Sequence, residues 1–421
     1  MNVFALIIIV ALAIDYILGI TSSLLNLKIL KLEPPAVLQG VYQPEEYRKS
    51  QQYLRTNTRF GLITDTFGLV VLFAFWFSGG FNWLDQLIRA WGFIPLVNGL
   101  IYIGILLLVN SLLELPSSIY HTFVIEERFG FNRTTVSTFI VDHVKGMGLM
   151  VVIGAPLLAG VLAQFQYAGS FAWIYCWVLI TLFSVAMQYI APTWIMPLFN
   201  KFKPLEQGEL RDAIQTYTES VKFPVKNILV MDGSRRSAKS NAFFTGFGDN
   251  KRIALFDTLI AKHTVSEMVA ILAHEIGHYK KKHIIQGTIV GIAHTVILLF
   301  LLSLFLNSPG LYQAFFMRQE SIYAGFLFFG LLYTPIEVVL SVIMNWWSRK
   351  NEYQSDIFAA ETTGAPLSMI DALKKLSANN LSNLTPHPFY VILNYSHPPL
   401  LKRIEAIQRL SIGGNEVYRH G

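Results

Sequence analysis

Seven long apolar stretches restrict the folds open to this chain more than any other feature of its sequence. Each lacks lysine and arginine, and each has about the 20 residues that a helix needs to cross a bilayer. Apolar residues form 53% of the chain and charged residues only 14%, against about a quarter in soluble domains. Pro116 is expected to end the third stretch. We predict transmembrane spans at residues 3–25, 60–77, 96–115, 146–165, 171–190, 284–306 and 322–346.

The distribution of basic residues predicts the orientation of these spans. When the segments between spans are assigned alternately to the two sides of the membrane, 31 of the 33 lysines and arginines fall on one side. Basic residues concentrate on the cytoplasmic side of membrane proteins. The N-terminus is therefore expected outside, and the polar segments 192–283 and 347–421 inside. The same placement accounts for the net charge of +6 without a nucleic-acid partner, and Lys280–Lys282 are expected at the anionic headgroups.

Several ionisable residues lie within the proposed spans. Charge in hydrocarbon is costly, so such side chains usually face the interior of a bundle or a water-filled cavity. One interpretation is a hydrated chamber inside the bundle. The alternative is that some of them pair locally or lie near the interface. These residues are Asp15, Asp65, Glu114, His294 and Glu337.

The polar segment before the sixth span contains a metal-binding motif. His274 and His278 stand four residues apart in a stretch that predicts a helix, with a capping-box pattern at Thr264–Glu267. Residues at this spacing share one helix face, so both imidazoles can reach one metal ion. Glu275 can then act as general base toward a water in the metal's open position. The motif predicts a zinc hydrolase; the alternative is a chance match or an inactive copy.

A third ligand must come from another part of the chain. The single cysteine, Cys176, lies in an apolar stretch, so nitrogen and oxygen ligands are expected. Glu352 and Asp356 follow the seventh span four residues apart, where its helix can continue beside the metal helix, and Gly364 marks a helix end. One of the two can bind zinc while the other orients a ligand. The alternative is a solvated helix face.

Segment 226–257 predicts a small β-sheet just before the metal helix. Its β-rich runs are 226–231, 241–247 and 252–256, with a hairpin turn at 248–250 between the last two. An edge strand at this place can bind an extended peptide through backbone hydrogen bonds. A purely structural sheet is the alternative.

These features divide the chain into four parts. Residues 1–191 hold five spans with their cytoplasmic loops, and residues 284–346 hold the last two. Residues 192–283 carry the expected hairpin and metal helix, and residues 347–421 are expected to supply the third ligand to the same domain. The predicted fold is an all-α polytopic membrane protein, whose seven helices enclose a chamber, with a cytoplasmic α+β zincin-like metalloprotease domain carrying a small β-sheet.

Long stretches across most of the chain match the motifs of one known family. They are 45–60, Thr122–Glu127 with Gly130-Phe131-Asn132, Pro197–Phe202, Asp232–Ser237 with Ser240-Asn241-Ala242, Ser348–Asp356, and Tyr395–Pro398 with Arg403. Through these motifs the chain resembles the type I CAAX prenyl proteases, integral-membrane zinc metalloproteases of the a-factor-converting kind. The resemblance implies seven helices around a water-filled chamber that the protease domain closes on the cytoplasmic side.

The resemblance also implies roles for individual residues. It implies one zinc ion held by His274, His278 and Glu352, with Glu275 as general base. One departure is Ser355, where the family pattern has alanine. Because serine is also small, this departure puts nothing in doubt.

Outside this ligand set, the resemblance implies a substrate strand and supporting residues. The substrate strand would carry Asn241, Ala242 and Phe243. His397 would donate a hydrogen bond to the oxyanion of the tetrahedral intermediate, although its sequence context alone indicates an ordinary loop histidine. The supports of the metal ligands would be Asp356 and Arg403.

We therefore predict a zinc-dependent membrane endopeptidase that cleaves near the C-terminus of prenylated CAAX-type substrates. The alternatives are a broader quality-control membrane protease and a transporter or lipid-binding protein with a structural zinc. The expected partners are a peptide or prenylated-protein C-terminus and the lipid bilayer, with no nucleic acid, and the expected state is a monomer. With no ER-retrieval motif after Arg419, we expect a bacterial inner (cell) membrane, alternatively the ER membrane.

Overall fold

Seven helical segments in the described part of the chain are long and apolar enough to cross a membrane. The computed structural model describes residues 2–30, 33, 43–223, 225, 227–245 and 252–417, so the expected turn at 248–250 lies outside it. The seven predicted spans are confirmed. They lie in α1 (Val3–Lys28), α2 (Pro44–Phe77), α4 (Pro95–Tyr120) with the π-helix η2 (His121–Glu126), α5 (Val136–Leu149) to α6 (Ala155–Tyr167) through η3 (Met150–Gly154), α7 (Ala172–Ile190) to α8 (Met196–Phe199) through η5 (Ala191–Ile195), α12 (His283–Phe305) and α14 (Ile322–Thr363).

The third span differs from its predicted end. Its helix α4 continues through Pro116 to Tyr120 and then into η2, so the prediction that Pro116 ends it is wrong. A proline removes one backbone hydrogen bond and crowds the preceding turn. Within a membrane bundle, however, neighbouring groups and local adjustments satisfy the freed carbonyl, so an interior proline is tolerated.

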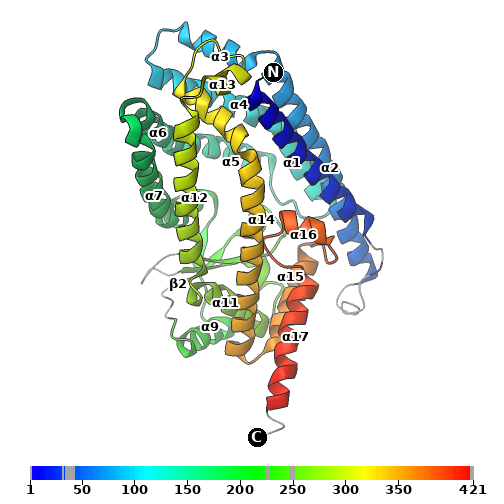
Figure 1. Cartoon of the computed structure of the whole chain (residues 1–421). Helices are drawn as coiled ribbons and strands as arrows, with labels where there is room; N and C mark the ends of the chain where they lie inside the picture. The colour runs from blue at the N-terminus through cyan, green and yellow to red at the C-terminus, as the bar shows by residue number, and fades with distance from the viewer. Residues whose placement is uncertain are drawn as a thin grey trace.

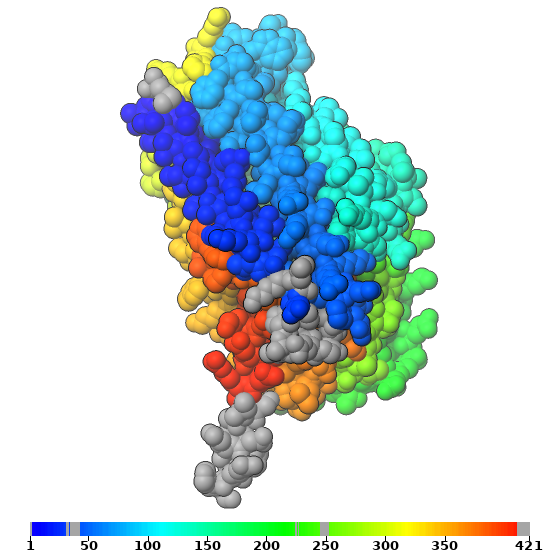
Figure 2. Space-filling view, turned by 90° about the vertical axis from the view of Figure 1, so that its right-hand side faces the viewer, coloured from blue at the N-terminus to red at the C-terminus, as the bar shows by residue number. Residues whose placement is uncertain are grey.

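The membrane helices and the remaining elements form two regions along the long axis of the molecule (Figure 1). α3 (Gly80–Arg89) and α13 (Pro309–Ala314) cap the end that holds the N-terminus. Figure 2 shows α1 lying against α2, with the C-terminal helices below them. The helices toward the opposite end are α9 (Glu209–Ser220), α10 (Asp257–Ile260), α11 (Val265–Lys280), α15 (Pro366–Asn379) and α17 (Leu400–Val417). α16 (Pro388–Asn394) lies between the two ends and contacts α1 and α14.

Each region has its own apolar core. The core of the membrane region is rich in aromatic side chains, among them Trp76 and Phe328, both of which are fully buried. The second core packs α9, α11, α15 and α17 against the sheet and includes Ile253 and Ile276. Helix α14 contributes to both cores, because it runs from the membrane bundle into the second region without a break.

A four-stranded mixed sheet covers one side of the second core. Its strands β1 (Phe202–Pro204), β2 (Asn227–Met231), β3 (Ala242–Thr245) and β4 (Arg252–Phe256) lie in the order β1-β2-β4-β3. β3 and β4 are antiparallel, as the hairpin pattern predicts, whereas β2 and β4 are parallel. β1 was not predicted. β3 is an edge strand of the described sheet and lies beside α11.

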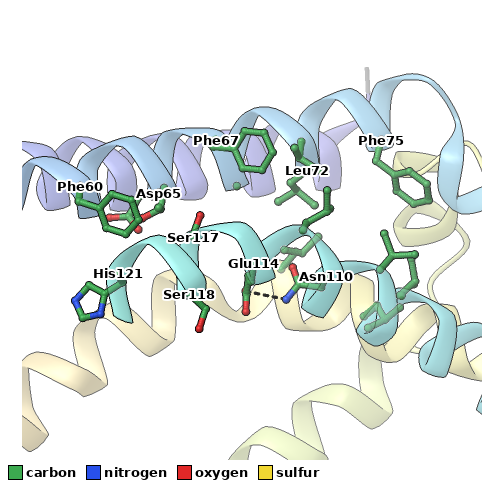
Figure 3. Close-up of a pocket in the computed structure, with 18 of the residues that line it drawn as sticks. Phe60, Asp65, Phe67, Leu72, Phe75, Asn110, Glu114, Ser117, Ser118 and His121 are labelled. Carbon is green, nitrogen blue, oxygen red and sulfur yellow. Dashed lines mark hydrogen bonds between the residues drawn. The ribbon is translucent and has the colours of Figure 1, made fainter. Parts of the chain in front are cut away.

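The intramembrane acids both line cavities and form local contacts. A cavity of about 790 Å³ between α2, α4 and α14 is bordered by Asp65 and Glu114 (Figure 3). A second cavity of about 460 Å³ is bordered by Asp15 and again by Asp65. Glu114 accepts a hydrogen bond from an asparagine one turn earlier, and Glu337 Oε2 lies 3.4 Å from His294 Nε2. Three of these residues therefore border cavities and three form local contacts, and the hydration of the cavities stays a prediction.

Helix α14 positions the second region through close contact with α11. It is 42 residues long and ends at Gly364, whose φ of 62° is the left-handed conformation that favours glycine. Gly277 of α11 faces this helix. A Cβ atom at Gly277 would lie 3.1 Å from Ser355 Cα and 3.2 Å from Phe358 Cδ1. A glycine at this point therefore allows the two helices to approach closely.

We predict that Gly277→Leu lowers the thermal stability of the detergent-solubilised protein. The added side chain would overlap the backbone of α14, and overpacking of this kind costs about 1–3 kcal/mol. Thermal unfolding followed by tryptophan fluorescence measures the effect. Gly291→Leu in α12 is the matched control, because a Cβ at Gly291 meets no described atom within 4 Å. Equal destabilisation by both substitutions would contradict the close approach.

Candidate active site

Helix α11 presents the two motif histidines on one face. The helix begins with the predicted capping box, in which Thr264 N–H donates to Glu267 Oε2 at 3.0 Å and Glu267 N–H donates to the Thr264 hydroxyl. The opposite face is anchored in the apolar core by residues such as Ile276. The Nε2 atoms of His274 and His278 lie 3.2 Å apart. The spacing of four residues therefore brings both imidazoles to one point, as the sequence predicts.

Helix α14 brings Glu352 to the same point. Glu352 Oε1 lies 3.2 Å from His278 Nε2, and Glu352 Oε2 lies 3.4 Å from His274 Nε2. Two nitrogens and one carboxylate oxygen form a ligand set that suits zinc and leaves a position open for water or substrate.

One carboxylate oxygen of Glu352 lacks a hydrogen bond, which supports a cation among these three residues. Glu352 is only 4% exposed. Its Oε2 has no hydrogen-bond partner in the described part of the chain, although His274 Nε2 lies 3.4 Å and Arg403 Nη2 3.6 Å from it. Burying a carboxylate oxygen without a partner is costly. A metal ion between the two imidazoles and Glu352 would satisfy this oxygen.

Asp356 and Arg403 support the site behind His274. Asp356 Oδ1 lies 2.8 Å from His274 Nδ1, so the carboxylate can accept the Nδ1 proton and leave Nε2 free on the metal side. Arg403 of α17 donates to both oxygens of Asp356, at 2.7 and 2.6 Å. Asp356 is fully buried, and the guanidinium compensates its charge there. The structure therefore brings both expected supporting residues together.

Glu275 lies next to the converging ligands, on the wall of a cavity. The cavity has a volume of about 480 Å³ and is also lined by His274, His278 and Glu352. Burial raises the pKa of Glu275 above its ordinary value, because desolvation disfavours the charged carboxylate, while the charges of the two histidines act in the opposite direction. A raised pKa suits a carboxylate that accepts and returns a proton.

His397 lines the same cavity from the loop between α16 and α17. Its Nε2 lies 3.4 Å from Glu352 Oε1, and its Nδ1 lies 3.0 Å from the Ser396 hydroxyl. When this hydroxyl donates to Nδ1, the proton of the neutral ring is on Nε2, directed into the site. Although the side chain is 65% exposed, desolvation in the cavity lowers the pKa of His397 and so favours this neutral form.

The expected substrate strand reaches the cavity only in part. Phe243 of β3 lines it, whereas Asn241 and Ala242 are not among its lining residues. Asn241 is exposed just before β3, and its side-chain oxygen accepts a hydrogen bond from Ala242 N–H at 2.9 Å. The strand positions of Ala242 and Phe243 are as expected, and their contact with a peptide stays a prediction.

Two residues near the site were not found from the sequence. His283 Nδ1 lies 3.1 Å from His278 Nδ1, and His283 Nε2 lies 3.0 Å from Gln354 Oε1. The sequence signal for His283 was its position five residues after the last motif histidine. It was not used because His283 directly follows three lysines, which were assigned to the membrane surface. The sequence reading also missed the apolar wall of the cavity, to which Phe244, Ile284, Met344 and Trp347 contribute.

Comparisons with known proteins cover nearly the whole chain. Residues 24–201 match the family model "CAAX prenyl protease N-terminal, five membrane helices", and residues 204–411 match "Peptidase family M48". The chain is 36% identical to the CAAX prenyl protease 1 homolog of Arabidopsis thaliana, covering 93% of this chain and 94% of the relative. It is 34% identical to CAAX prenyl protease 1 of Saccharomyces cerevisiae, covering 91% and 90%. The chain belongs to the CAAX prenyl protease 1 family.

Membership of the CAAX prenyl protease 1 family also agrees with the fold. The structure of this chain matches the crystal structure of S. mikatae Ste24p with a TM-score of 0.92 and 32% sequence identity. The match covers 97% of this chain and 99% of the Ste24p chain. The human CAAX prenyl protease 1 homolog is 30% identical, with 89% of each chain covered. The predicted family, fold class, enzyme class and zinc cofactor are confirmed. The chain is a zinc-dependent, multi-pass membrane metallopeptidase.

For this CAAX prenyl protease 1 family member, we predict that Glu352→Ala lowers the zinc content of the purified protein from one ion per chain toward zero. The substitution removes the only oxygen among the three converging ligand atoms. Elemental analysis after dialysis measures the change. Glu361→Ala, an exposed site on the same helix, is the matched control and should keep its zinc. Full zinc retention by Glu352→Ala would show that the metal binds elsewhere.

Proposed function

We propose that this protease hydrolyses peptide bonds near the C-terminus of prenylated CAAX-type proteins, with water as the nucleophile. The observation that carries the proposal is the convergence of His274, His278 and Glu352 on a cavity that Glu275 also lines. The substrate class comes from the relatives named CAAX prenyl protease 1, which align with this chain over about nine-tenths of its length.

His274, His278 and Glu352 hold the zinc ion in this proposal. When bound, zinc supplies Lewis-acid activation of the water and of the scissile carbonyl. Asp356, backed by Arg403, accepts the His274 Nδ1 proton and keeps that imidazole oriented. Three protein ligands leave the fourth zinc position open, next to the Glu275 carboxylate. A structural zinc site has four protein ligands and no open position, so a transporter or lipid-binding protein with a structural zinc is not favoured.

Two groups of the chain act on the reacting atoms. Glu275 accepts a proton from the attacking water and delivers it to the leaving amine, as its position on the cavity wall and its raised pKa allow. His397 donates its Nε2–H to the oxyanion that develops on the scissile carbonyl. Oxyanion donors of this kind contribute roughly 3 kcal/mol to the stabilisation of the transition state.

The substrate backbone pairs with the outer edge of β3 at Asn241, Ala242 and Phe243. Support comes from the position of β3 at the edge of the described sheet and from Phe243 on the cavity wall. An edge strand offers backbone donors and acceptors to any sequence, which suits binding of varied C-terminal peptides.

The division of the chain and its membrane placement complete the proposal. Residues 1–191 and 284–346 form the membrane region, and residues 192–283 and 347–421 form the protease domain, a division supported by two separate apolar cores.

The N-terminus lies outside and the protease domain in the cytoplasm, as the basic residues indicate. The relatives named above are eukaryotic, so we propose the ER membrane and not the bacterial inner membrane. The enzyme acts as a monomer without nucleic acid.

Cleavage of a farnesylated CAAX peptide tests the function. Purified wild type in detergent should cleave it faster than the unprenylated peptide of the same sequence. Glu275→Gln should bind one zinc per chain yet lose cleavage, because the amide cannot accept the proton of the water. Mass spectrometry of the products and zinc analysis give both readouts. Equal cleavage of both peptides would favour a broader membrane protease, and turnover by Glu275→Gln would refute the assigned base.

We predict that His397→Ala lowers kcat by roughly a hundredfold or more while zinc content stays at one ion per chain. In the proposal, His397 contacts the substrate through its Nε2–H, which donates to the oxyanion. Because this hydrogen bond forms as the oxyanion develops, its loss destabilises the transition state and lowers kcat. Steady-state kinetics with the farnesylated peptide measures the change, and His387→Ala, at the start of α16, is the control. Near-normal kinetics in His397→Ala would return this residue to the role of an ordinary loop histidine.

A further inference from the structure

The two metal-site histidines of α11 have different partners behind them. His274 is backed directly by the carboxylate of Asp356. His278 is backed by a second imidazole, since its Nδ1 lies 3.1 Å from His283 Nδ1. His283 in turn contacts Gln354, with 3.0 Å between His283 Nε2 and Gln354 Oε1. The mechanism proposed above uses neither His283 nor Gln354.

The backbone between α11 and α12 brings His283 back toward the motif. α11 ends at Lys280, and Lys282 adopts a left-handed conformation with φ of 61° before α12 begins at His283. His283 is 7% exposed and lies on the cavity wall with His278. Gln354 comes from α14, two residues after Glu352. The chain of contacts therefore joins α11, α12 and α14 on one side of the ligand set.

The contacts in this chain, with the Gln354 amide oriented as in the structure, agree with one arrangement of the protons. An amide oxygen can only accept, so the contact with Gln354 Oε1 places a proton on His283 Nε2. The neutral His283 ring then has a lone pair on Nδ1, which accepts the Nδ1 proton of His278. With its proton on Nδ1, His278 presents an unprotonated Nε2 toward Glu352 and His274, as a metal ligand must.

We propose that His283 and Gln354 are positioning residues that fix the ring orientation and tautomer of His278 for zinc binding. The proposal rests on the role of His278 as a zinc ligand. The two residues orient His278 as Asp356 orients His274, but through neutral groups.

The electrostatics of the site explain why the second support is neutral. Glu352 and Asp356 are both buried, and Arg403 lies near both, with Nη2 3.6 Å from Glu352 Oε2 and 2.6 Å from Asp356 Oδ1. A third buried carboxylate behind His278 would need a further compensating cation. An imidazole and an amide orient the ligand without that additional charge.

Zinc affinity of the purified full-length protein tests the proposal independently of cleavage. Competition with a chromogenic chelator should give a zinc dissociation constant about 10–100-fold higher for His283→Phe than for wild type. Phenylalanine keeps a ring of similar shape but has no acceptor for the His278 proton. His283→Asn should restore most of the affinity, because its side-chain oxygen can occupy the place of the imidazole Nδ1.

A second pair of variants separates this role from packing. Gln354→Leu should also weaken zinc binding, since it leaves His283 in place but removes the acceptor that sets its tautomer. Gln286→Leu, at an exposed site three residues further along α12, should leave the affinity unchanged. The visible spectrum of the cobalt-substituted protein should change with His283→Phe and Gln354→Leu, and not with His283→Asn.

Three results would contradict the proposal. Wild-type affinity in both His283→Phe and Gln354→Leu would overturn it while leaving the zinc site intact. Equal losses in His283→Phe and His283→Asn would assign His283 to packing alone. If His283→Phe does not fold, the affinity of Gln354→Leu decides. A wild-type protein that binds no zinc would overturn the ligand set of the proposed function together with this inference.

Discussion

The close packing of α11 against α14 determines where the groups of the metal site lie. α11 supplies His274 and His278, and α14 supplies Glu352, so neither helix forms a ligand set alone. The glycine at position 277 lets the helices approach until a Cβ would meet the neighbouring backbone at 3.1 Å. The apolar core beneath them, and not the polar contacts, holds this arrangement, since burial of apolar surface is the main favourable term in folding. The ligand geometry is therefore as rigid as the helix contact.

Charge compensation adds the last helix of the chain to this arrangement. Asp356 is fully buried, and a buried carboxylate is tolerated only when it is paired and hydrogen-bonded. Arg403 provides both through two short contacts from α17. Its Nη2 also approaches Glu352 at 3.6 Å, so one guanidinium lowers the cost of two buried carboxylates. A residue near the end of the given sequence in this way supports the ligand set that α11 and α14 form.

Local patterns in the sequence predict much of this structure, and contacts between distant segments account for the rest. The spans follow from long apolar stretches without lysine or arginine, and the motif spacing brings the two histidines together. Glu352 and Asp356 were candidates because they follow a span whose helix can continue beside the motif, and the family resemblance assigned the ligand role to Glu352. His397 needed the family resemblance, since a loop histidine has no periodic pattern. Pro116 was misread because the bundle, and not the local sequence, decides whether a helix continues. His283 was missed because its contact depends on a left-handed turn at Lys282.

The length of α14 links the enzyme to the thickness of its membrane. The helix has 42 residues and so spans about 60 Å at 1.5 Å per residue. Transmembrane helices adjust their tilt when the hydrocarbon layer is thinner or thicker than the apolar segment. A tilt change of about 5° at the membrane end would displace Glu352, roughly 45 Å along the axis, by about 4 Å. Catalytic groups tolerate only about 0.5 Å of misplacement. Because α11, α15 and α17 all contact α14, a tilt of α14 that carried them along would change the angle of the site to the membrane surface and preserve its internal geometry.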